Sequence, residues 1–290
     1  IFGQTSWQAK FDVSSLNGIN GFSMTGKKDV DIIGAAVSNA GDVNGDGIDD
    51  VIISGCCSWS GSSAFVLFGS KKPFNQTIAL DQLDGTNGFK IIAGEYKKNK
   101  YHLAASVDRA GDFNNDGYGD IIIGAPGNNG GGDIIIGAPG HSPQAGGLVF
   151  VIYGKKSFSS SLSLDALDKT EGLCLTGTYN HLGNSVSYLG DINGDGITDI
   201  GMSEYDQHPG LHYASGNSYV VFGGSHSGLF LNLTSLDGTN GFAVIVNSTQ
   251  YSGGGCVIKC IGYINDDNIA DFAIGIPDYG MDGNGNSGGI

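Results

Sequence analysis

The stretch GDFNNDGYGDIIIGAP at residues 111–126 decides the fold. It joins an Asp-rich loop to an apolar run, and loops of the same kind recur along the chain. The four loops read GDVNGDGIDD (41–50), GDFNNDGYGD (111–120), GDINGDGITD (190–199) and GYINDDNIAD (262–271). Self-similarity at such intervals is the signature of a repeat architecture. The sequence therefore predicts four copies of one structural unit.

Two further landmarks accompany each loop. One is an apolar or aromatic residue pair followed by glycine, which is typical of a strand end: Ile1-Phe2-Gly3, Leu67-Phe68-Gly69, Ile152-Tyr153-Gly154 and Val221-Phe222-Gly223. The other is a polar segment that closes on an apolar pair: SLNGINGF (15–22), QLDGTNGF (82–89), ALDKTEGL (166–173) and SLDGTNGF (235–242). The landmarks divide one domain, residues 1–290, into repeats at approximately 1–66, 67–151, 152–220 and 221–290.

Each repeat reads as four strands. The first is rich in small residues, as at 32–41, 102–111 and 181–190, which suits a strand where several sheets converge on an axis. The second and third are continuous apolar runs, as at 120–126 and 148–154, which fit strands covered on both faces. The fourth is shorter, as at 21–26, 88–94 and 172–177. A repeating four-stranded unit predicts an all-β fold of β-propeller blades.

The repeat pattern is irregular at the two chain ends and at one insertion. The chain ends on Gly288-Gly289-Ile290, which matches Gly146-Gly147-Leu148, and it begins on a strand end. Either four blades almost close on themselves, or the chain is cut from a longer array. The second repeat is long because GDIIIGAPG occurs twice, at 119–127 and 132–140. We expect a protruding hairpin or loop there, as a recognition element or a neutral accident.

The composition supports a turn-rich β fold and limits the partners. The chain has 290 residues, 51 of them Gly, and a net charge of −15. Asp accounts for 26 of the 29 acidic residues and Arg109 is the only arginine, so turn formers exceed helix formers. Nucleic acids and anionic membranes require clustered Lys and Arg, and are excluded as partners. No apolar run reaches the ~18 residues of a membrane span, so we expect no direct membrane insertion by this segment.

The Asp-rich loops place oxygen atoms at alternating positions, with glycine at the sharp turn. Such a loop can wrap a hard cation with six or seven oxygens, and all-oxygen ligation favours Ca²⁺. The predicted ligands are the side chains at loop positions 1, 3, 5 and 9 and the carbonyl at position 7. They are Asp42, Asn44, Asp46, Ile48 and Asp50; Asp112, Asn114, Asp116, Tyr118 and Asp120; and Asp191, Asn193, Asp195, Ile197 and Asp199. The alternative is a metal-free Asx/Gly turn.

The fourth loop departs from this pattern. Tyr263 replaces the first Asp and Asn268 replaces the Gly. Because Asn tolerates positive φ, the turn itself can survive. The weak candidate ligands there are Asn265, Asp267, Ile269 and Asp271. Fold stability is the favoured reason for this loop, and a fourth calcium site the alternative.

Together these motifs resemble FG-GAP repeats, the blades of the integrin α-subunit head propeller. Phe68-Gly69, the Gly-Ala-Pro at 124–126 and the Asp-rich loops carry the resemblance, which covers essentially the whole chain. Family propellers usually have seven blades, whereas four repeats are present here. The resemblance implies Ca²⁺ in the loop between the first two strands of a blade, and ligands on the opposite face or the rim.

The cysteines and the N-glycosylation sequons indicate in which cellular compartment the protein works. Cys56, Cys57, Cys174, Cys256 and Cys260 include no C-x-x-C spacing, so they are buried small hydrophobes or members of an unassigned disulfide. Three Asn-x-Ser/Thr sequons, at Asn75, Asn232 and Asn247, suggest glycosylation of a secreted chain. Millimolar extracellular calcium would suit the Asp-rich loops.

The expected function is a calcium-stabilised, non-catalytic adhesion module at the cell surface. Its partner would be a protein or glycan ligand, or copies of itself. Two alternatives stay open: a structural subunit of an extracellular fibre, coat or surface assembly, and an accessory propeller of a secreted hydrolase or lyase. No P-loop occurs, and the Gly-rich stretch at 280–289 reads as a flexible turn, which favours the non-enzymatic function.

Overall fold

The structure is a computed structural model that describes residues 1–26, 32–56, 63–92, 104–126, 147–177, 181–204, 217–245 and 257–276. Within these ranges the regular elements are β-strands and short 3-10 turns, and none is a helix that could cross a bilayer. The all-β prediction is confirmed. The second GDIIIGAPG copy, with the hairpin or loop expected there, lies outside the described residues.

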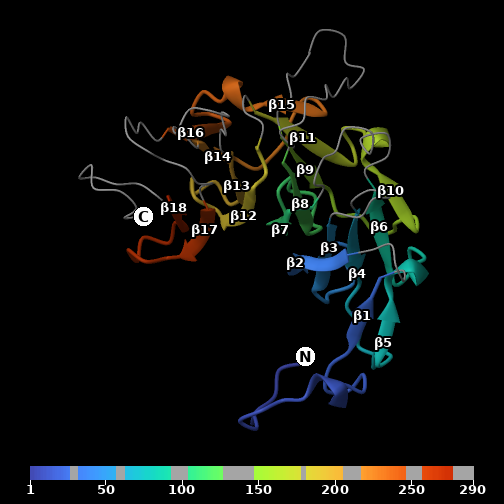
Figure 1. The fold of residues 1–290 in the computed structure, drawn as a ribbon. Helices are drawn as coiled ribbons and strands as arrows, with labels where there is room; N and C mark the ends of the chain where they lie inside the picture. The colour runs from blue at the N-terminus through green and yellow to red at the C-terminus, as the bar shows by residue number, and fades with distance from the viewer. Residues whose placement is uncertain are drawn as a thin grey trace, which may run out of the picture.

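Three sheets, each with four antiparallel strands, form the predicted blades, and two of them gain a fifth, parallel strand (Figure 1). The first contains β2 (Ile32–Gly41), β3 (Asp50–Cys56), β4 (Ser63–Leu67) and β6 (Gly88–Ile92). The second contains β7 (Ser106–Gly111), β8 (Asp120–Ala125), β9 (Leu148–Ile152) and β11 (Gly172–Thr176). The third contains β12 (Ser185–Gly190), β13 (Asp199–Ser203), β14 (Asn217–Val221) and β16 (Gly241–Ile245).

The two ends of the described chain carry parts of further blades. β17 (Val257–Gly262) and β18 (Asp271–Gly275) pair as a first and a second strand, and β1 (Ser23–Thr25) corresponds to a fourth strand. Figure 1 shows β1 and β18 at opposite ends of an open arc. The two ends therefore do not close on each other in this structure.

The first strands of neighbouring blades lie side by side at the inner margin of the arc, as their small residues predict (Figure 1). A carboxylate from β7 joins several of them. Asp108 Oδ1 accepts a hydrogen bond from Ser38 Oγ on β2 at 2.6 Å, and Asp108 Oδ2 lies 3.2 Å from Lys259 Nζ on β17. Polar contacts therefore link three of the inner strands.

Two of these first strands begin later than their sequences suggest. The apolar pattern predicts strands from 102 and 181, whereas β7 begins at Ser106 and β12 at Ser185. Ala104 has a φ of 59° and Gly183 a φ of 90°, which are incompatible with extended backbone. The chain turns there because it meets the preceding blade: a Cβ on Gly183 would lie 2.8 Å from Gly124 Cα.

Short strands in the connection between the third and fourth strands of each blade pair with the preceding blade, and they were not predicted. They are β5 (Thr77–Ala79), β10 (Ser161–Ser163) and β15 (Phe230–Asn232), and each runs into a 3-10 turn: η2 (Leu80–Gln82), η4 (Leu164–Ala166) and η5 (Leu233–Ser235). Each pairs in parallel with the outer strand of the preceding blade, namely β1, β6 and β11. Three residues of alternating polarity give too weak a signal for a strand to be recognised.

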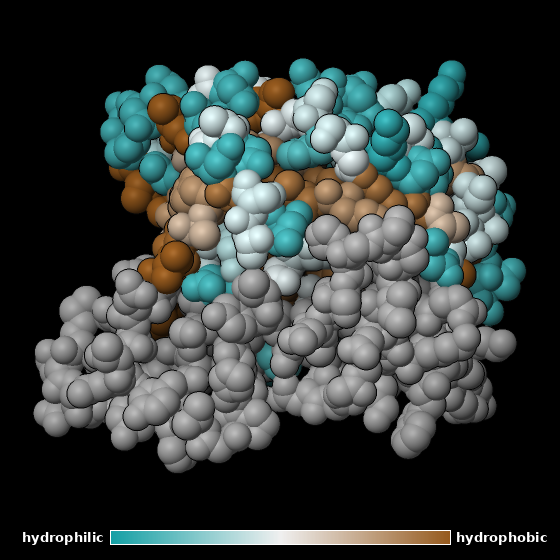
Figure 2. Space-filling view, turned by 90° about the horizontal axis from the view of Figure 1, so that it is seen from above, coloured by the Kyte–Doolittle hydropathy of each residue, from teal (hydrophilic) through white to brown (hydrophobic). Residues whose placement is uncertain are grey.

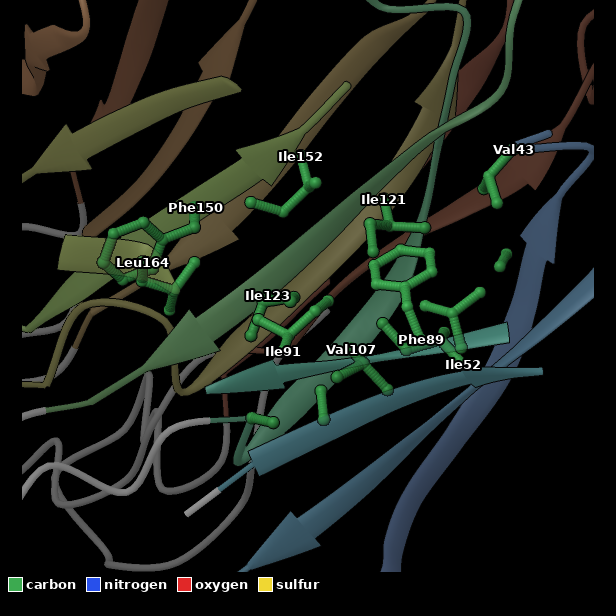
Figure 3. Packing of buried hydrophobic residues seen from close by; sticks show 14 of the residues in the cluster. Val43, Ile52, Phe89, Ile91, Val107, Ile121, Ile123, Phe150, Ile152 and Leu164 are labelled. Carbon is green, nitrogen blue, oxygen red and sulfur yellow. The ribbon is translucent and has the colours of Figure 1, made fainter. Parts of the chain in front are cut away.

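The hydrophobic core lies between blades. One cluster fills the space between the first and second blades, where Ile52 and Phe89 meet Ile121, Ile123 and Phe150 (Figure 3). A second cluster lies between the second and third blades. The strands β8 and β9 are buried along their whole length, which confirms that both their faces are covered. Because each sheet contributes to two clusters, neighbouring blades stabilise one another.

The close approach between blades gives a first prediction. A Cβ on Gly124 would lie 2.0 Å from the carbonyl oxygen of Gly183 in the next blade, whereas among the described residues a Cβ at the equivalent Gly275 has its nearest neighbour at 3.9 Å. We expect Gly124→Ala to lower the free energy of unfolding by about 1–3 kcal/mol, because backbone must move. The control Gly275→Ala should change it by less than about 0.5 kcal/mol. Equal effects in denaturant unfolding would contradict this packing.

Candidate metal centre

Each Asp-rich loop connects the first and second strands of a blade. The loops lie between β2 and β3, β7 and β8, β12 and β13, and β17 and β18. The sequence predicts loops that join two strands, and this placement is confirmed. All four loops therefore leave their blades at the same end of the first strand.

The side chains at positions 1, 3 and 5 accept backbone N–H groups from inside the loop. In the second loop, Asp112 Oδ1 accepts from Asp116 N at 2.8 Å and Asp112 Oδ2 from Gly117 N at 3.0 Å. Asn114 Oδ1 also accepts from Asp116 N, and Asp116 Oδ1 accepts from Tyr118 N at 2.9 Å. The same bonds recur in the first and third loops. Three loops of different sequence thus share one conformation.

The Asp at position 9 is buried and connects the loop to a distant strand end. Asp120 is 0% exposed; its Oδ2 accepts from Phe113 N at 2.9 Å and its Oδ1 from Gly154 N at 2.7 Å. In the first blade Asp50 accepts in the same way from Val43 N and Gly69 N. In the third, Asp199 accepts from Ile192 N and Gly223 N. The glycine is always that of the aromatic–glycine strand end, so two landmarks of the repeat meet at this carboxylate.

Burial disfavours the ionised form of these three aspartates. It raises the pKa of Asp50 and of Asp120 to about 7 and that of Asp199 to about 6, while the backbone hydrogen bonds act in the other direction. Nearby loop carboxylates, such as Asp46 beside Asp50, raise the pKa further. A cation in the loop would favour the ionised form of all these groups, because an opposite charge lowers a carboxyl pKa.

The loops also connect neighbouring blades. Gly119 N donates to Asp42 O at 2.9 Å, and Ala270 N donates to Asp191 O at 3.0 Å. The residue after the strand-end glycine, Lys155, donates from its backbone N–H to Val43 O at 2.9 Å. The first and third loops are thereby held by the blade that follows them, so their conformation and the blade-to-blade contact depend on each other.

The donor chemistry of these loops fits a hard cation. In the first three loops every predicted ligand atom is an oxygen, from two Asp side chains, one Asn, one carbonyl and the buried Asp. Asn114 Nδ2 donates to Asp116 Oδ2 at 2.9 Å, so the Asn amide here supplies a positive partner for the carboxylate. Within the described ranges, no three His, Cys, Asp or Glu side chains form a preassembled metal cluster. The ligand set therefore stays a prediction.

The fourth loop keeps the turn but lacks the first carboxylate. Asn268 has a φ of 62°, as the tolerance of Asn for this region predicts, and Asp271 Oδ2 accepts from Ile264 N at 2.7 Å. The hydrogen bond inside the loop at position 5 is also kept, because Asp267 Oδ1 accepts from Ile269 N at 2.8 Å. Tyr263 stands where Asp would lie, and it is 64% exposed. The donor set is therefore the least suited to a cation among the four loops.

The other predicted features are only partly described. Asn75 is exposed, whereas Asn232 is half-buried and its Oδ1 accepts from Thr234 N at 3.0 Å. Cys174 is a buried free thiol whose pKa burial raises to about 12, as expected of a small core residue, and Cys260 is also free. Asn247, Cys57, Cys256 and the side chain of Cys56 lie outside the described residues.

Comparison with known proteins agrees with this architecture. Residues 106–132, which include the second Asp-rich loop, match the family model described as FG-GAP repeat. The chain is 31% identical to integrin alpha pat-2 of Caenorhabditis elegans over 188 residues, which are 62% of this chain and 13% of that protein. It is also 30% identical to a rat phosphatidylinositol-glycan-specific phospholipase D over 151 residues, 51% of this chain and 16% of the relative.

Together the match at 106–132 and the integrin α relative support an FG-GAP, integrin α-like fold for this chain. Its antiparallel sheets are accordingly the blades of a β-propeller fold. A mouse phosphatidylinositol-glycan-specific phospholipase D is 27% identical over 46% of this chain and 16% of its own length. The aligned part is thus a small fraction of each relative. The FG-GAP repeats define the fold here, and function has to be inferred from the site.

The buried Asp gives a second prediction. Asp120→Asn replaces one carboxylate oxygen by an NH₂ group, so either Phe113 N or Gly154 N loses its acceptor. An unsatisfied buried N–H costs about 1–3 kcal/mol, so we expect a loss of this size even with excess chelator. The control Asp116→Asn changes an exposed group and should alter unfolding in chelator by less than about 0.5 kcal/mol. Chemical denaturation of both variants measures the difference.

Proposed function

We propose that this chain is a calcium-stabilised, non-catalytic recognition module that works at the cell surface or outside the cell. The observation that carries the proposal is the threefold recurrence of one loop geometry with an all-oxygen donor set. Three copies of the same carboxylate arrangement would repel internally unless a cation were present. The similarity to an integrin α chain supports an adhesion-type role.

Calcium would act structurally in this proposal. Each ion would be held by Asp, Asn, Asp and Asp side chains and one carbonyl, in the loop where two blades meet. Bound Ca²⁺ supplies positive charge, while the protein's own contribution is to hold the loop by the buried Asp and by the next blade. Each ion present at 100 times its dissociation constant would add ~2.7 kcal/mol to the free energy of unfolding.

The partner in this proposal is a protein or a glycan. The resemblance to FG-GAP propellers directs ligands to the face opposite the Asp-rich loops or to the rim. Glycans on Asn75, Asn232 and Asn247 would fit an extracellular site of action. Asn75 is exposed and follows Phe74 in the connection between β4 and β6 of the first blade, which makes it accessible to modification.

A second candidate function is favoured by the two phospholipases. Their similarity supports an accessory propeller of a secreted hydrolase, with catalytic residues outside these 290 residues or in a pocket of this chain away from the Asp-rich loops. Hydrolysis of a phosphatidylinositol-glycan by this chain, surviving substitution of all three intact Asp-rich loops, would favour it over the recognition module. A structural subunit of an extracellular assembly is the remaining alternative, and self-association is its signature.

Calcium removal gives the third prediction. We expect excess chelator to lower the thermal unfolding midpoint by many degrees, and native mass spectrometry in calcium to show three bound ions. The control is a triple variant, Asp42→Asn, Asp112→Asn and Asp191→Asn, whose midpoint should not respond to calcium. An unchanged midpoint of the unmodified chain in chelator would contradict a structural role for the metal.

The fourth loop gives a gain-of-function prediction. Tyr263→Asp supplies the missing first carboxylate in a loop that already has the required turn. We expect native mass spectrometry to show one more calcium ion than in the unmodified chain. Tyr263→Asn, which is similar in size but uncharged, should bind it more weakly. The same ion count in all three proteins would show that position 1 does not control binding.

A further inference from the structure

We propose that the first and second Asp-rich loops act as a coupled pair, in which Tyr118 makes calcium bound in one loop strengthen calcium binding in the other. The coupling presupposes the calcium sites proposed above and concerns the contact between two loops, not the ligands of either. Because coupling between two sites is reciprocal, each loop would raise the affinity of the other by the same factor.

Position 4 has a left-handed backbone in all four Asp-rich loops. The φ values are 72° at Gly45, 60° at Asn115, 77° at Gly194 and 61° at Asp266. Since Asn and Asp occupy this region in two of the loops, the turn itself does not require glycine. The neighbours of position 4, and not its φ, therefore distinguish one loop from another.

The ring of Tyr118 lies against Gly45. A Cβ on Gly45 would lie 2.6 Å from Tyr118 Cε1. Among the described residues, a Cβ on the equivalent Gly194 has its nearest neighbour at 3.9 Å, on Ile269. Tyr118 stands at position 7 of the second loop, where the other three loops carry isoleucine. Its carbonyl is a predicted ligand of the second loop and its ring reaches the residue between positions 3 and 5 of the first, so Tyr118 connects the ligands of the two loops.

A backbone hydrogen bond joins the same two loops. Gly119 N donates to Asp42 O at 2.9 Å, and a Cβ on Gly119 would lie 3.1 Å from Asp42 N. Gly119 lies between Tyr118 and the buried Asp120, both predicted ligands of the second loop. Asp42 is the first predicted ligand of the first loop. An ion that fixes residues 118–120 therefore also holds Asp42, so the first loop loses less conformational freedom when it binds its own ion.

The junction between the second and third loops is built differently. Position 4 of the second loop is Asn115. Ile197, at position 7 of the third loop, packs on the strand end of its own blade, since a Cβ on Gly223 would lie 2.6 Å from Ile197 Cγ2. Thr198 reaches the second blade with its side chain, because its Oγ1 donates to Ala110 O at 2.9 Å. Ala110 lies before the loop, so this contact does not hold a predicted ligand.

One hydrogen bond is common to both junctions. Lys155 N donates to Val43 O at 2.9 Å, and Gly224 N donates to Phe113 O at 2.6 Å. In each case the residue after a strand-end glycine bonds to position 2 of the preceding loop. Because this bond is shared, the Tyr118 ring and the Gly119 bond are what distinguish the first junction. We therefore expect the first and second loops to be coupled more strongly than the second and third.

Repulsion between two bound cations would oppose the coupling. The Asp-rich loops leave the blades at one end of the sheets, and Asp46 and Asp116 are exposed. Figure 2 shows hydrophilic residues along one margin of the molecule and a band of hydrophobic residues beneath them, so charges at such a margin meet solvent. Salt screens exposed charges beyond about 8 Å at physiological ionic strength, whereas the ring acts at van der Waals contact. The contact therefore prevails at physiological salt, and the coupling should increase as salt is added.

Native mass spectrometry across a calcium titration tests the coupling in pairs of loops. Asp191→Asn leaves the first and second loops, which touch, and Asp112→Asn leaves the first and third, which belong to blades that are not neighbours. For two independent sites the one-ion form is at least about half of the population at half saturation, and a coupling of about fivefold or more between similar sites lowers it below about a third. We expect the lower value in Asp191→Asn alone.

Tyr118→Ile tests the ring without removing a predicted ligand, because position 7 binds through its carbonyl. It copies the residue of the other loops, and in the Asp191→Asn background we expect it to raise the one-ion form to about half or more. Gly45→Asn disturbs the same contact from the first loop, and its matched control is Gly194→Asn. Both copy Asn115, but only Gly45→Asn meets a ring, so it alone should lower the thermal midpoint in chelator. Adding Tyr118→Ile should remove the effect of Gly45→Asn.

The outcomes separate the coupling from the calcium sites themselves. No bound ion in any variant would remove the sites and the coupling together. Two bound ions in Asp191→Asn with a one-ion form of about half or more, or a population that ignores Tyr118→Ile, would keep the calcium sites and overturn the coupling. Equal thermal midpoints of Gly45→Asn and Gly194→Asn would contradict the ring contact on which the coupling depends.

Discussion

A buried carboxylate that accepts two backbone N–H groups is the contact on which each blade depends. In Asp120 one oxygen holds the start of the Asp-rich loop and the other holds Gly154, at the end of the third strand. Asp50 and Asp199 repeat the arrangement in the neighbouring blades. Because each carboxylate is buried, its charge is costly unless donors and nearby positive charge offset it. The loop supplies the donors, and a cation would supply the charge.

The same loops transmit this constraint between blades. Backbone bonds such as Gly119 N to Asp42 O join consecutive loops, and close glycine contacts such as Gly124 against Gly183 O leave no room for a side chain. Apolar clusters then fill the space between the sheets. A blade alone would expose half of its core, so the repeats are stable only as a stack.

Much of the fold could be predicted from the sequence because its signals are local and repeated. The apolar runs at 120–126 and 148–154 identify β8 and β9, and the alternating Asp and Asn residues identify the loop conformation. The short parallel strands could not be predicted, because segments such as Ser161–Ser163 are too short for a period and form strands only against another blade. The role of Asp120 was also missed in part. The spacing of the loop residues suggested that Asp120 is a metal ligand. Its hydrogen bond to Gly154, 34 residues further along the chain, forms only when the blade folds.

Amide hydrogen exchange at Gly69, Gly154 and Gly223 tests the carboxylate bridge most directly. These glycines end their strands next to exposed turns, so without the bridge their amides would exchange as fast as those of the loops. If the bridge holds, all three exchange as slowly as the amides of β8, with or without calcium, and among them Gly154 alone loses its protection in Asp120→Ala, which removes both acceptor oxygens. Fast exchange of all three in the unmodified chain would contradict the bridge as the contact that holds each blade together.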